Sequence, residues 1–418
     1  ILISIFAGGD RPIICEKTQS DKCNIPIYSN GIENNGLYGF TNKPVVNVSS
    51  ITISARGTIG FSCIRYEPFV PIVRLITIIP FTKYIDLVFL KIAFDTLFSF
   101  SEGSSIPQLT VPTIKQFLIP LPPIAEQKRI VTAIETIFTQ IDILETNKAN
   151  LQTAVKQAKS KILDLAIHGK LVPQDPADEP ASVMLERLRA EKEAKIAAGE
   201  IKCRKNDSYI YKNSTDNCYY QKYTDGCEEN ISDEIPFDVP AGWAWCKLPE
   251  VCRKPITDGT HNSPSNSASG DFLYITAKNI KNLAICLDDA TYISKEIHES
   301  IYSRCSPELN DILLTKDGTI GEVAVNNLNY PFSMLSSIAL IKPSNEILSW
   351  FLAYILISDL LQNKMKKEAK GSALKRIILA QINDFLIPLP PLAEQQRIVT
   401  KIEELFAQLD FIMTALVD

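Results

Sequence analysis

The sequence contains few of the residues that build metal sites and none of the usual spacings. It has three histidines, His168, His261 and His298, which lie far apart along the chain. Its ten cysteines include no Cys-x-x-Cys pair. This pattern favours the reduced thiols of a cytoplasmic protein over a zinc site or a disulfide framework. We therefore expect no metal ion.

Motifs for catalysis are also missing. The sequence has no Gly-x-Gly-x-x-Gly or Walker phosphate loop, and no Asn/Asp-Pro-Pro-Tyr/Phe element for adenine methylation. We therefore expect no catalytic residues and no cofactor bound by this chain. A self-contained nuclease or methyltransferase is the alternative, and it would bind S-adenosylmethionine or Mg²⁺ by itself.

Uninterrupted hydrophobic runs are short. The two stretches nearest to a membrane span are residues 70–94, which contain Arg74, Lys83 and Asp86, and residues 350–361, which are too few to cross a bilayer. We expect no membrane segment. The chain starts at Ile1 without a charged-then-apolar leader, so we expect a cytoplasmic protein, and the absent Met suggests that the first residues of a domain are missing.

Charge is spread unevenly over a chain of ordinary composition. The 418 residues are 45% hydrophobic and 22% charged, which suits two or three globular domains. The formal net charge of -5 argues against nucleic acid, but much of the deficit lies in residues 170–235. Residues 364–376 instead carry six basic side chains and one acidic one. That segment is either a phosphate-binding patch or a solvated helix end.

One long stretch occurs twice. Residues 117–142, FLIPLPPIAEQKRIVTAIETIFTQID, return as residues 385–410, FLIPLPPLAEQQRIVTKIEELFAQLD, with 19 of 26 positions identical. In each copy an apolar, strand-like run meets a Leu-Pro-Pro break, and a helix opens at Ala-Glu-Gln. The duplication predicts a pseudo-symmetric chain. Glu126, Gln127, Glu394 and Gln395 open the two helices, where capping or dipole compensation is the expected role.

Both predicted helices carry apolar residues at spacings of four and three. These seam residues are Ile130, Ile134, Ile137, Ile141, Leu144, Leu151, Val155, Ile162 and Leu165 in the first helix, and Ile398, Ile402, Leu405, Leu409, Ile412 and Leu416 in the second. A 3.5-residue repeat of this length predicts a coiled coil, in which the simplest arrangement pairs the two helices antiparallel. The alternative is two amphipathic helices that pack on separate domains.

These patterns predict an α+β chain. Two pseudo-symmetric mixed α/β domains are separated by an antiparallel coiled coil of two long helices. The predicted segments are a first domain with an incomplete N-terminus at 1–123, a spacer helix at 124–169, a linker with a short charged helix and a mobile loop or hairpin at 170–235, a second domain at 236–391, and a C-terminal spacer helix at 392–418.

The two predicted domains share anchor sequences. ARGTIG at 55–60 matches KDGTIG at 316–321, and a GSS or GSA segment precedes each copy of the repeat. Between these anchors the sequences differ almost completely. Two domains that share anchor sequences but differ in their loops indicate that each domain recognises a different target.

With these motifs the chain resembles the specificity subunit of type I restriction-modification systems. The doubled IPLPPxAEQxxI element, the PAGWAW segment at 240–245, DGTHNSP at 258–264, DGTIG and GSA carry the resemblance, which covers nearly the whole chain. It implies two target recognition domains that each read half of a bipartite DNA site, and helices that dock two methyltransferase subunits. Motor-nuclease subunits complete such an enzyme, and S-adenosylmethionine, ATP and Mg²⁺ are expected on those partners.

The first domain departs from the family pattern. It begins at ILISIFAGG and has no counterpart of the PAGWAW segment, so an initial strand is expected to be absent. A second hypothesis therefore stands beside DNA recognition: a truncated scaffold or decoy that binds the methyltransferase without productive DNA recognition. In the first hypothesis the paired helices hold the two domains about one duplex turn, ~34–36 Å, apart.

Polar residues in the predicted loops are the candidate DNA contacts. They are Asn34, Asn35, Lys43 and Arg56 in the first domain, and His261, Asn262, Lys278, Asn279, Lys281, Lys316, Lys370, Ser372, Lys375 and Arg376 in the second. Arg56 and Lys316 are predicted at equivalent turn tips, where a basic side chain reaches guanine or phosphate. The alternative for each residue is plain solvated surface. The cluster from Lys370 to Arg376 is the strongest, and we expect phosphate contacts there.

Overall fold

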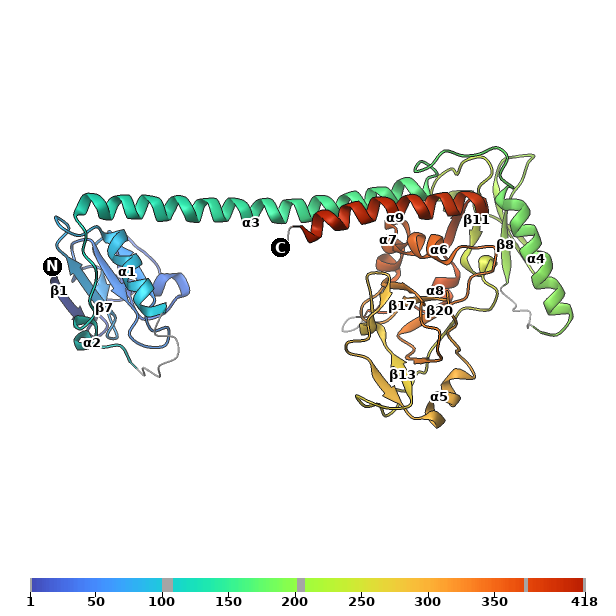
Figure 1. Cartoon of the computed structure of the whole chain (residues 1–418). Helices are drawn as coiled ribbons and strands as arrows, with labels where there is room; N and C mark the ends of the chain where they lie inside the picture. The colour runs from blue at the N-terminus through green and yellow to red at the C-terminus, as the bar shows by residue number, and fades with distance from the viewer. Residues whose placement is uncertain (1, 100–107, 201–206, 372–374, 416–418) are drawn as a thin grey trace. The chain divides into compact units, whose positions relative to one another are not determined.

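The computed structural model describes residues 2–99, 108–200, 207–371 and 375–415. These residues form two compact units, Ile1–Asn147 and Lys148–Asp418 (Figure 1). Both units mix strands and helices, and the chain contains the two long helices α3 (Ile124–Ile167) and α9 (Leu392–Thr414). The predicted α+β fold class is confirmed. No helix in the described part of the chain is long and apolar enough to cross a membrane.

The first unit contains two small sheets, and helices pack on the larger one. The strand orders are β1-β7-β4-β5 and β3-β2-β6. The strands are β1 (Leu2–Ala7), β2 (Ile25–Tyr28), β3 (Leu37–Thr41), β4 (Ser50–Ile53), β5 (Ser62–Arg65), β6 (Val70–Pro71) and β7 (Ile76–Pro80). Helix α1 (Leu87–Ser99) packs on β4 and β5, and the short helix α2 (Val111–Lys115) leads to α3.

The second unit contains a larger set of small sheets. The strand orders are β12-β20-β17-β18, β16-β13-β19, β11-β21, β14-β15 and β10-β9-β8. The strands are β8 (Ser208–Lys212), β9 (Tyr219–Tyr223), β10 (Glu228–Asn230), β11 (Ala244–Lys247), β12 (Thr257–Asp258), β13 (Phe272–Ile275), β14 (Ile280–Lys281), β15 (Ala284–Ile285), β16 (Thr291–Ile293), β17 (Ile312–Thr315), β18 (Val323–Val325), β19 (Ser333–Met334), β20 (Ile338–Ile341) and β21 (Leu386–Leu389). Its shorter helices are α4 (Ala181–Ala197), α5 (Lys295–Tyr302), α6 (Ser349–Ile357), α7 (Asp359–Glu368) and α8 (Leu379–Asn383).

Residues 349–368 form two helices, α6 and α7, because Ser358 between them has an extended backbone and its hydroxyl donates to the Ile355 carbonyl at 2.6 Å. Within the linker a mobile loop or a hairpin was predicted, and the hairpin is confirmed. Strands β8 and β9 pair antiparallel, β10 adds a third strand, and the buried side chains Ile210 and Tyr219 pack with Trp245.

The internal repeat extends well beyond the sequence match. The four-stranded sheets of the two units have equivalent strand orders, and Ile51↔Ile78 and Ile53↔Ile76 in β4 and β7 correspond to Ile312↔Ile341 and Leu314↔Ala339 in β17 and β20. A short parallel pair follows the same plan in each unit, between β2 and β6 and between β13 and β19. The two units are therefore copies of one fold, although the sequences of these strands differ.

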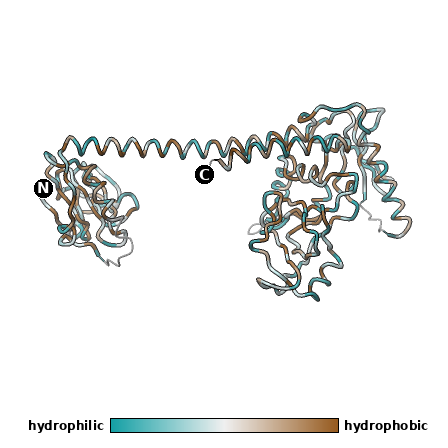
Figure 2. Tube along the Cα trace, in the orientation of Figure 1, coloured by the Kyte–Doolittle hydropathy of each residue, from teal (hydrophilic) through white to brown (hydrophobic). Residues whose placement is uncertain are grey.

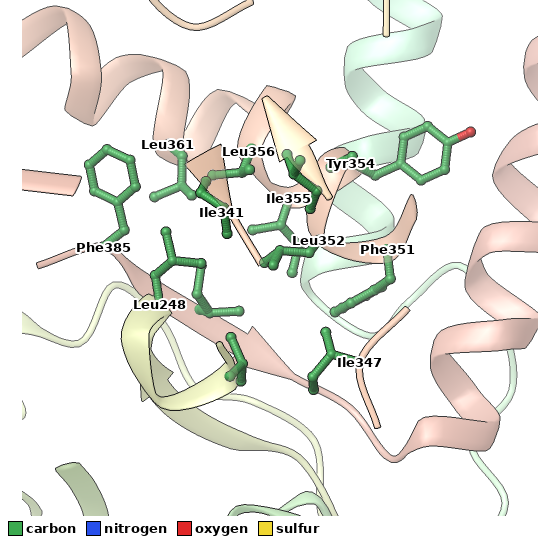
Figure 3. Packing of buried hydrophobic residues seen from close by; sticks show 14 of the residues in the cluster. Leu248, Ile341, Ile347, Phe351, Leu352, Tyr354, Ile355, Leu356, Leu361 and Phe385 are labelled. Atoms are coloured by element: carbon green, nitrogen blue, oxygen red, sulfur yellow. The ribbon is translucent and has the colours of Figure 1, made fainter. Parts of the chain in front are cut away.

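The largest core lies in the second unit around α6. Residues 351–356 of this helix are all buried, because the helix is apolar on every side and is enclosed by β18, α7 and α9. Figure 3 shows Leu352, Ile355 and Leu356 gathered around Ile341, with Phe385 beside Leu361. Burial of each such side chain stabilises the fold by roughly 1.5–3 kcal/mol. This core fixes the sheet that carries the loops described below.

A buried glutamine joins each Leu-Pro-Pro break to the start of an earlier helix, α1 or α6. In the first unit Gln127 accepts from the Asp86 N–H at 2.8 Å and donates to the Pro122 carbonyl at 2.8 Å. In the second unit Gln395 accepts from the Leu348 N–H at 3.0 Å and donates to the Pro390 carbonyl at 3.1 Å. Asp86 and Leu348 directly precede α1 and α6, so the same amide fixes the start of the same helix in both copies.

Helices α3 and α9 pack antiparallel along the end of α3. Lys159 forms an ion pair with Asp410 at 2.5 Å, and further along α3 the buried Leu163, Ala166 and Ile167 share one core cluster with Ile398 and Ile402. Rising residue numbers on α3 therefore meet falling numbers on α9, and both helices lie side by side in Figure 1. The predicted antiparallel pairing is confirmed for this segment.

The predicted seam is covered over only part of its length. Val155, Ile398 and Ile402 are buried, and Ile162 and Leu165 are partly buried. Four predicted seam residues on α3 are exposed, which corrects the prediction that α9 covers them: Ile137, Ile141, Leu144 and Leu151. Ile412 on α9 is also exposed, and Leu416 lies outside the described residues. Pairing with α9 is seen only from about Val155 onward, and Figure 2 shows polar and apolar residues mixed along α3.

The glutamate before the second glutamine is buried in an environment that disfavours its charge. Glu394 is 1% exposed, and its Oε2 accepts from the Trp243 indole N–H at 2.9 Å. Its Oε1 has no hydrogen-bond partner among the described residues. Burial raises the pKa of Glu394 above its ordinary value of 4.5. The equivalent Glu126 is exposed.

The raised pKa of Glu394 gives a pH-dependent contribution to stability. Because the folded state holds this proton more tightly than the unfolded state, the contribution is present at low pH and is lost as the pH rises from about 4.5 through the raised pKa. We predict that Glu394→Gln raises the free energy of unfolding at about pH 7.5 and that the difference from wild type shrinks toward about pH 4.5. Urea denaturation across this range measures the effect. Glu126→Gln is the matched control and is expected to change little, and a Glu394→Gln curve parallel to wild type contradicts the prediction.

Candidate nucleic-acid interface

In the first unit a two-asparagine turn projects from a rigid support. Asn34 (φ 47°) and Asn35 (φ 54°) are exposed and have left-handed backbones, a conformation that asparagine tolerates better than most residues. Behind the turn, the buried Arg65 donates to the Asn35 carbonyl at 2.6 Å and to Thr52 Oγ1 at 3.0 Å. Its guanidinium lies 3.5 Å from the centroid of the Tyr28 ring. The two amide side chains are thus presented to solvent on an anchored backbone.

Arg65 is part of the scaffold rather than the exposed surface. It is 7% exposed, and burial lowers its pKa from the ordinary arginine value. The sequence did not identify it as a site residue. Its position at the end of a strand carries no local signal, because the contact that defines its role is with Asn35, thirty residues earlier.

The other candidates of the first unit are exposed. Arg56 lies in the turn after β4 and donates to Gln108 Oε1 at 3.0 Å, and Lys43 lies in the segment between β3 and β4. Their contact with DNA stays a prediction.

Lys316 does not lie at the tip of its turn, which corrects the prediction. It is 7% exposed, and its Nζ lies 3.4 Å from Asp258 Oδ2 and 3.6 Å from Asp317 Oδ2. The hydrogen bonds Gly60 N–H to Ser54 O and Gly321 N–H to Thr315 O align Lys316 with Ala55, so that Arg56 corresponds to Asp317. An ungapped comparison of ARGTIG with KDGTIG already contains this signal.

Asp258 connects three loops of the second unit. Besides Lys316, its carboxylate faces Arg304 Nη2 at 3.3 Å and the exposed His261 Nε2 at 3.6 Å. Arg304, which follows α5, also donates to the Gly259 carbonyl. Register pairs Asp258 with Ala339 as it pairs Ala7 with Ile76, so the first unit has alanines, Ala7 and Ala55, where the second has the Asp258–Lys316 ion pair. The charged cluster is specific to the second unit.

The strongest predicted cluster lies beside this network. Lys370 and Arg376 exchange two backbone hydrogen bonds, at 3.0 and 2.9 Å, and the Gly318 N–H donates to the Lys375 carbonyl at 3.0 Å. Arg376 Nε lies 3.9 Å from Asp317 Oδ1. The side chains of Lys370, Lys375 and Arg376 are exposed, as predicted. Ser372 lies outside the described residues.

Asn279 is a structural residue, which is a second correction. It is 1% exposed, its Oδ1 accepts from the Thr276 N–H at 3.0 Å, and its Nδ2 donates to the Cys286 carbonyl at 3.1 Å. The neighbours Lys278 and Lys281 are exposed, and so are His261 and Asn262 in the loop after Asp258. The exposed candidates of the second unit are therefore His261, Asn262, Lys278, Lys281, Lys370, Lys375 and Arg376.

The described residues contain no group of three or more His, Cys, Asp and Glu side chains placed to hold a metal ion. His298 is buried and shares a hydrogen bond of 2.9 Å with Ser333 Oγ, while its ring stacks on Phe272. Nine cysteines are free thiols, and the tenth, Cys203, lies outside the described residues. Burial raises the pKa of Cys252 to about 12 and of Cys305 to about 11, which makes both poor nucleophiles at neutral pH.

The Asp258 network makes a stability prediction with an internal control. Asp258→Asn leaves the buried Lys316 with one weaker partner, and we expect a loss of about 3 kcal/mol in the free energy of unfolding, together with faster amide hydrogen exchange in residues 259–264. Asp311→Asn is the matched control, because Asp311 is a buried carboxylate that pairs with Arg253 and Lys342 away from this loop. Both variants should be destabilised in urea denaturation. Equal exchange in residues 259–264 for the two variants contradicts the anchoring role of Asp258.

Comparison with known proteins agrees with this duplicated architecture. The family model for the type I restriction modification DNA specificity domain matches residues 4–153 and 240–416, which together are more than half of the chain. Among solved structures, one of a type I restriction-modification system, described for its complex assembly and conformational transition, has a TM-score of 0.59 at 15% identity and covers 99% of this chain and 92% of that one. At this identity the likeness concerns the fold alone.

Curated relatives carry the same description. The chain is 28% identical to the EcoAI specificity subunit of Escherichia coli over 64% of this chain and 42% of the relative, and 24% identical to the EcoBI subunit over 75% and 56%. It is 22% identical to the MjaIX specificity subunit of Methanocaldococcus jannaschii over 97% and 82%. The chain thus spans about half the length of the first two relatives. The match of the family model to both copies of the duplicated fold shows that the chain belongs to the type I restriction-modification specificity subunits.

Proposed function

We propose that this chain is a non-catalytic DNA-recognition subunit that reads a bipartite site with its two units and directs an adenine methyltransferase to that site. S-adenosylmethionine, ATP and Mg²⁺ are expected on partner subunits, which are two methyltransferase subunits and motor-nuclease subunits. Membership of the specificity-subunit family supports this role. The strand arrangement shared by the two units supports the proposal of a site in two parts.

The observation that carries the proposal is that the two units share one strand arrangement but differ in the residues of their loops. Equivalent strands keep their register in both units, so equivalent loops begin and end at equivalent places. The first unit presents Asn34 and Asn35 on an anchored turn after β2, whereas the segment after the equivalent strand β13 of the second unit presents Lys278 and Lys281. Amide and ammonium groups both bond to base edges in the major groove. Different groups on one frame are what recognition of two unlike half-sites requires.

Exposed cations next to these loops supply the affinity that does not depend on sequence. Lys370, Lys375 and Arg376 lie on one pair of bridged segments beside the turn at 317–321. Lysine and arginine side chains bind phosphates and fix the position of a protein on the duplex, while base contacts specify the sequence. This division of labour explains how a chain with a net charge of -5 binds DNA locally.

The exposed part of the apolar seam of α3 offers a docking surface for a helix of a partner protein. Ile137, Ile141 and Leu144 are 55, 42 and 67% exposed and are spaced by four and three residues, so they form one apolar stripe. Three large apolar side chains on one face of a helix are typical of an interaction surface. We propose that a methyltransferase subunit docks there.

Methylation mapping distinguishes this function from the decoy hypothesis. Cells that express the chain with its methyltransferase are sequenced by a long-read method that detects methylated adenines. A two-part motif with an unread gap supports the proposal. A decoy instead lowers methylation by an active complex without any new motif, and a continuous motif read by one unit also contradicts the bipartite site.

Lengthening α3 should lengthen the unread gap. An insertion of one heptad between Leu144 and Leu151 keeps the phase of the seam and adds about 10 Å of helix, which equals about three base pairs. We predict that the two half-motifs stay unchanged and that the gap between them grows by about three base pairs. In the matched control, the seven-residue sequence replaces seven residues of α3 at this point, so that the length of the helix stays unchanged. An altered half-motif, or an unchanged gap in an active complex, contradicts the role of α3 as a spacer.

Removal of the phosphate-binding cations should weaken DNA binding without changing the motif. For Lys375→Ala with Arg376→Ala we expect the slope of log affinity against log salt to fall by about two, because each phosphate contact contributes about 0.9. Lys212→Ala with Lys222→Ala, on the sheet of β8 and β9, removes the same charge elsewhere. Fluorescence anisotropy of the methyltransferase complex on its own site measures both slopes. Equal slopes for the two double variants contradict the assignment.

A further inference from the structure

The segments before α2 and α8 are joined to the glycine turns of their units by the same hydrogen bond. In the first unit the Leu109 N–H donates to the Ala55 carbonyl at 3.0 Å. In the second unit the Ile377 N–H donates to the Lys316 carbonyl at 2.9 Å. Ala55 and Lys316 are equivalent residues of the two turns, so Leu109 and Ile377 are equivalent as well. The sequence match of GSSIPQLTV with GSALKRIIL gives the same alignment.

Beside this bond, one side chain of the turn faces one side chain of the segment. On the turn, the residue after the acceptor is Arg56 or Asp317, and on the segment, the residue before the donor is Gln108 or Arg376. Arg56 Nη2 donates to Gln108 Oε1 at 3.0 Å. Arg376 Nε lies 3.9 Å from Asp317 Oδ1. We call these two couples the arginine pairs. Each unit has one arginine at this place, which comes from the turn in the first unit and from the segment in the second.

Both arginine pairs keep a positive charge at the surface. Arg56 and Arg376 are exposed. The partner of Arg56 is a neutral amide, so the first pair carries one positive charge. In the second unit the pair belongs to a network in which three cations face two carboxylates: Lys316, Arg304, Arg376, Asp258 and Asp317. An anion is therefore the ligand that both pairs favour.

Phosphate is the part of DNA that suits a feature common to both units. DNA carries its negative charge on phosphates, which are the same in every half-site. The bases differ between two unlike half-sites, and the loops of the two units differ accordingly. A cation that both units hold at the same place in their common strand arrangement therefore matches phosphate better than any one base. The planar guanidinium suits this contact, because two parallel N–H groups bind two phosphate oxygens.

We propose that each arginine pair binds one DNA phosphate through its arginine, and that Gln108 and Asp317 are positioning residues that direct the guanidinium. The inference rests on the proposed DNA recognition and extends it to a contact common to both half-sites. The arginine functions from either segment, because the two units already contain both arrangements. Exchanging the two members of one pair should therefore keep the phosphate contact.

Conversion of the first pair into the second tests the proposal. Arg56→Asp removes the cation, and Arg56→Asp with Gln108→Arg places an arginine on the segment opposite an aspartate. The exchange is made in the first unit because Asp317 also faces the buried Lys316. We expect Arg56→Asp to weaken DNA binding about tenfold or more and to lower the slope of log affinity against log salt by about 0.9, and the double variant to restore both. Fluorescence anisotropy of the methyltransferase complex on its own site measures them. Lys83→Asp makes the same change of charge in the exposed segment before α1, and as the control it should leave the slope unchanged.

The positioning role has a separate readout. Gln108→Ala leaves Arg56 without its partner, and we expect a loss of about threefold in affinity, because the guanidinium loses its fixed direction before it binds. Gln108→Glu restores an acceptor, like the carboxylate of Asp317, and should bind DNA nearly as well as the wild type. An equal loss in both variants contradicts positioning by residue 108.

The outcomes separate this inference from the proposed function. Binding by the wild-type complex without restoration in the double variant overturns the arginine pair alone. A changed first half-motif in methylation mapping of the double variant assigns the arginine to a base and overturns the phosphate contact. Absence of a bipartite motif in the wild type contradicts the proposed function and this inference together. If Arg56→Asp lowers the free energy of unfolding in urea, Arg56→Gln replaces it, since that variant removes the charge without introducing another.

Discussion

A buried glutamine at the start of each repeated helix is the interaction on which the rest of the fold depends. Two prolines end an extended segment in each unit. The amide of Gln127 or Gln395 forms hydrogen bonds both with that segment and with the residue directly before α1 or α6. Each hydrogen bond contributes only about 1 kcal/mol net, but a buried amide left without partners costs about as much again for every group. The glutamine therefore fixes the direction in which α3 and α9 leave their units.

The two units show how one frame carries different surfaces. Strand registers are kept, because a shift of one residue turns every core side chain toward solvent. The positions beside the loops are free to differ, and the Ala7 and Ala55 pair of the first unit is replaced by Asp258 and Lys316 in the second. A buried ion pair binds its loop through charge, whereas backbone hydrogen bonds such as Val73 N–H to Gly9 O at 2.9 Å hold the equivalent loop of the first unit. Recognition can thus change while the fold stays the same.

Some apolar surfaces of the molecule are buried against other elements, whereas similar surfaces elsewhere are exposed. The end of α3 is buried against α9, but Ile137, Ile141 and Leu144 are exposed at heptad spacing. In the first unit Leu118 is exposed where its counterpart Leu386 lies under Trp245. Open surfaces of this kind weaken an isolated chain and favour association.

The sequence by itself determined the duplication, the two long helices and the α+β class, because these depend on local signals: proline breaks, heptad spacing and glycine turns. It also placed Lys370, Lys375 and Arg376 on the surface, since a dense run of charge cannot be buried. Only the tertiary structure decided that Lys316 and Asn279 face inward and that Asp258 joins three loops. Asn279 depends on Cys286, seven residues away, and Lys316 depends on Asp258, 58 residues away. A side chain turns inward only when such a partner compensates the loss of water.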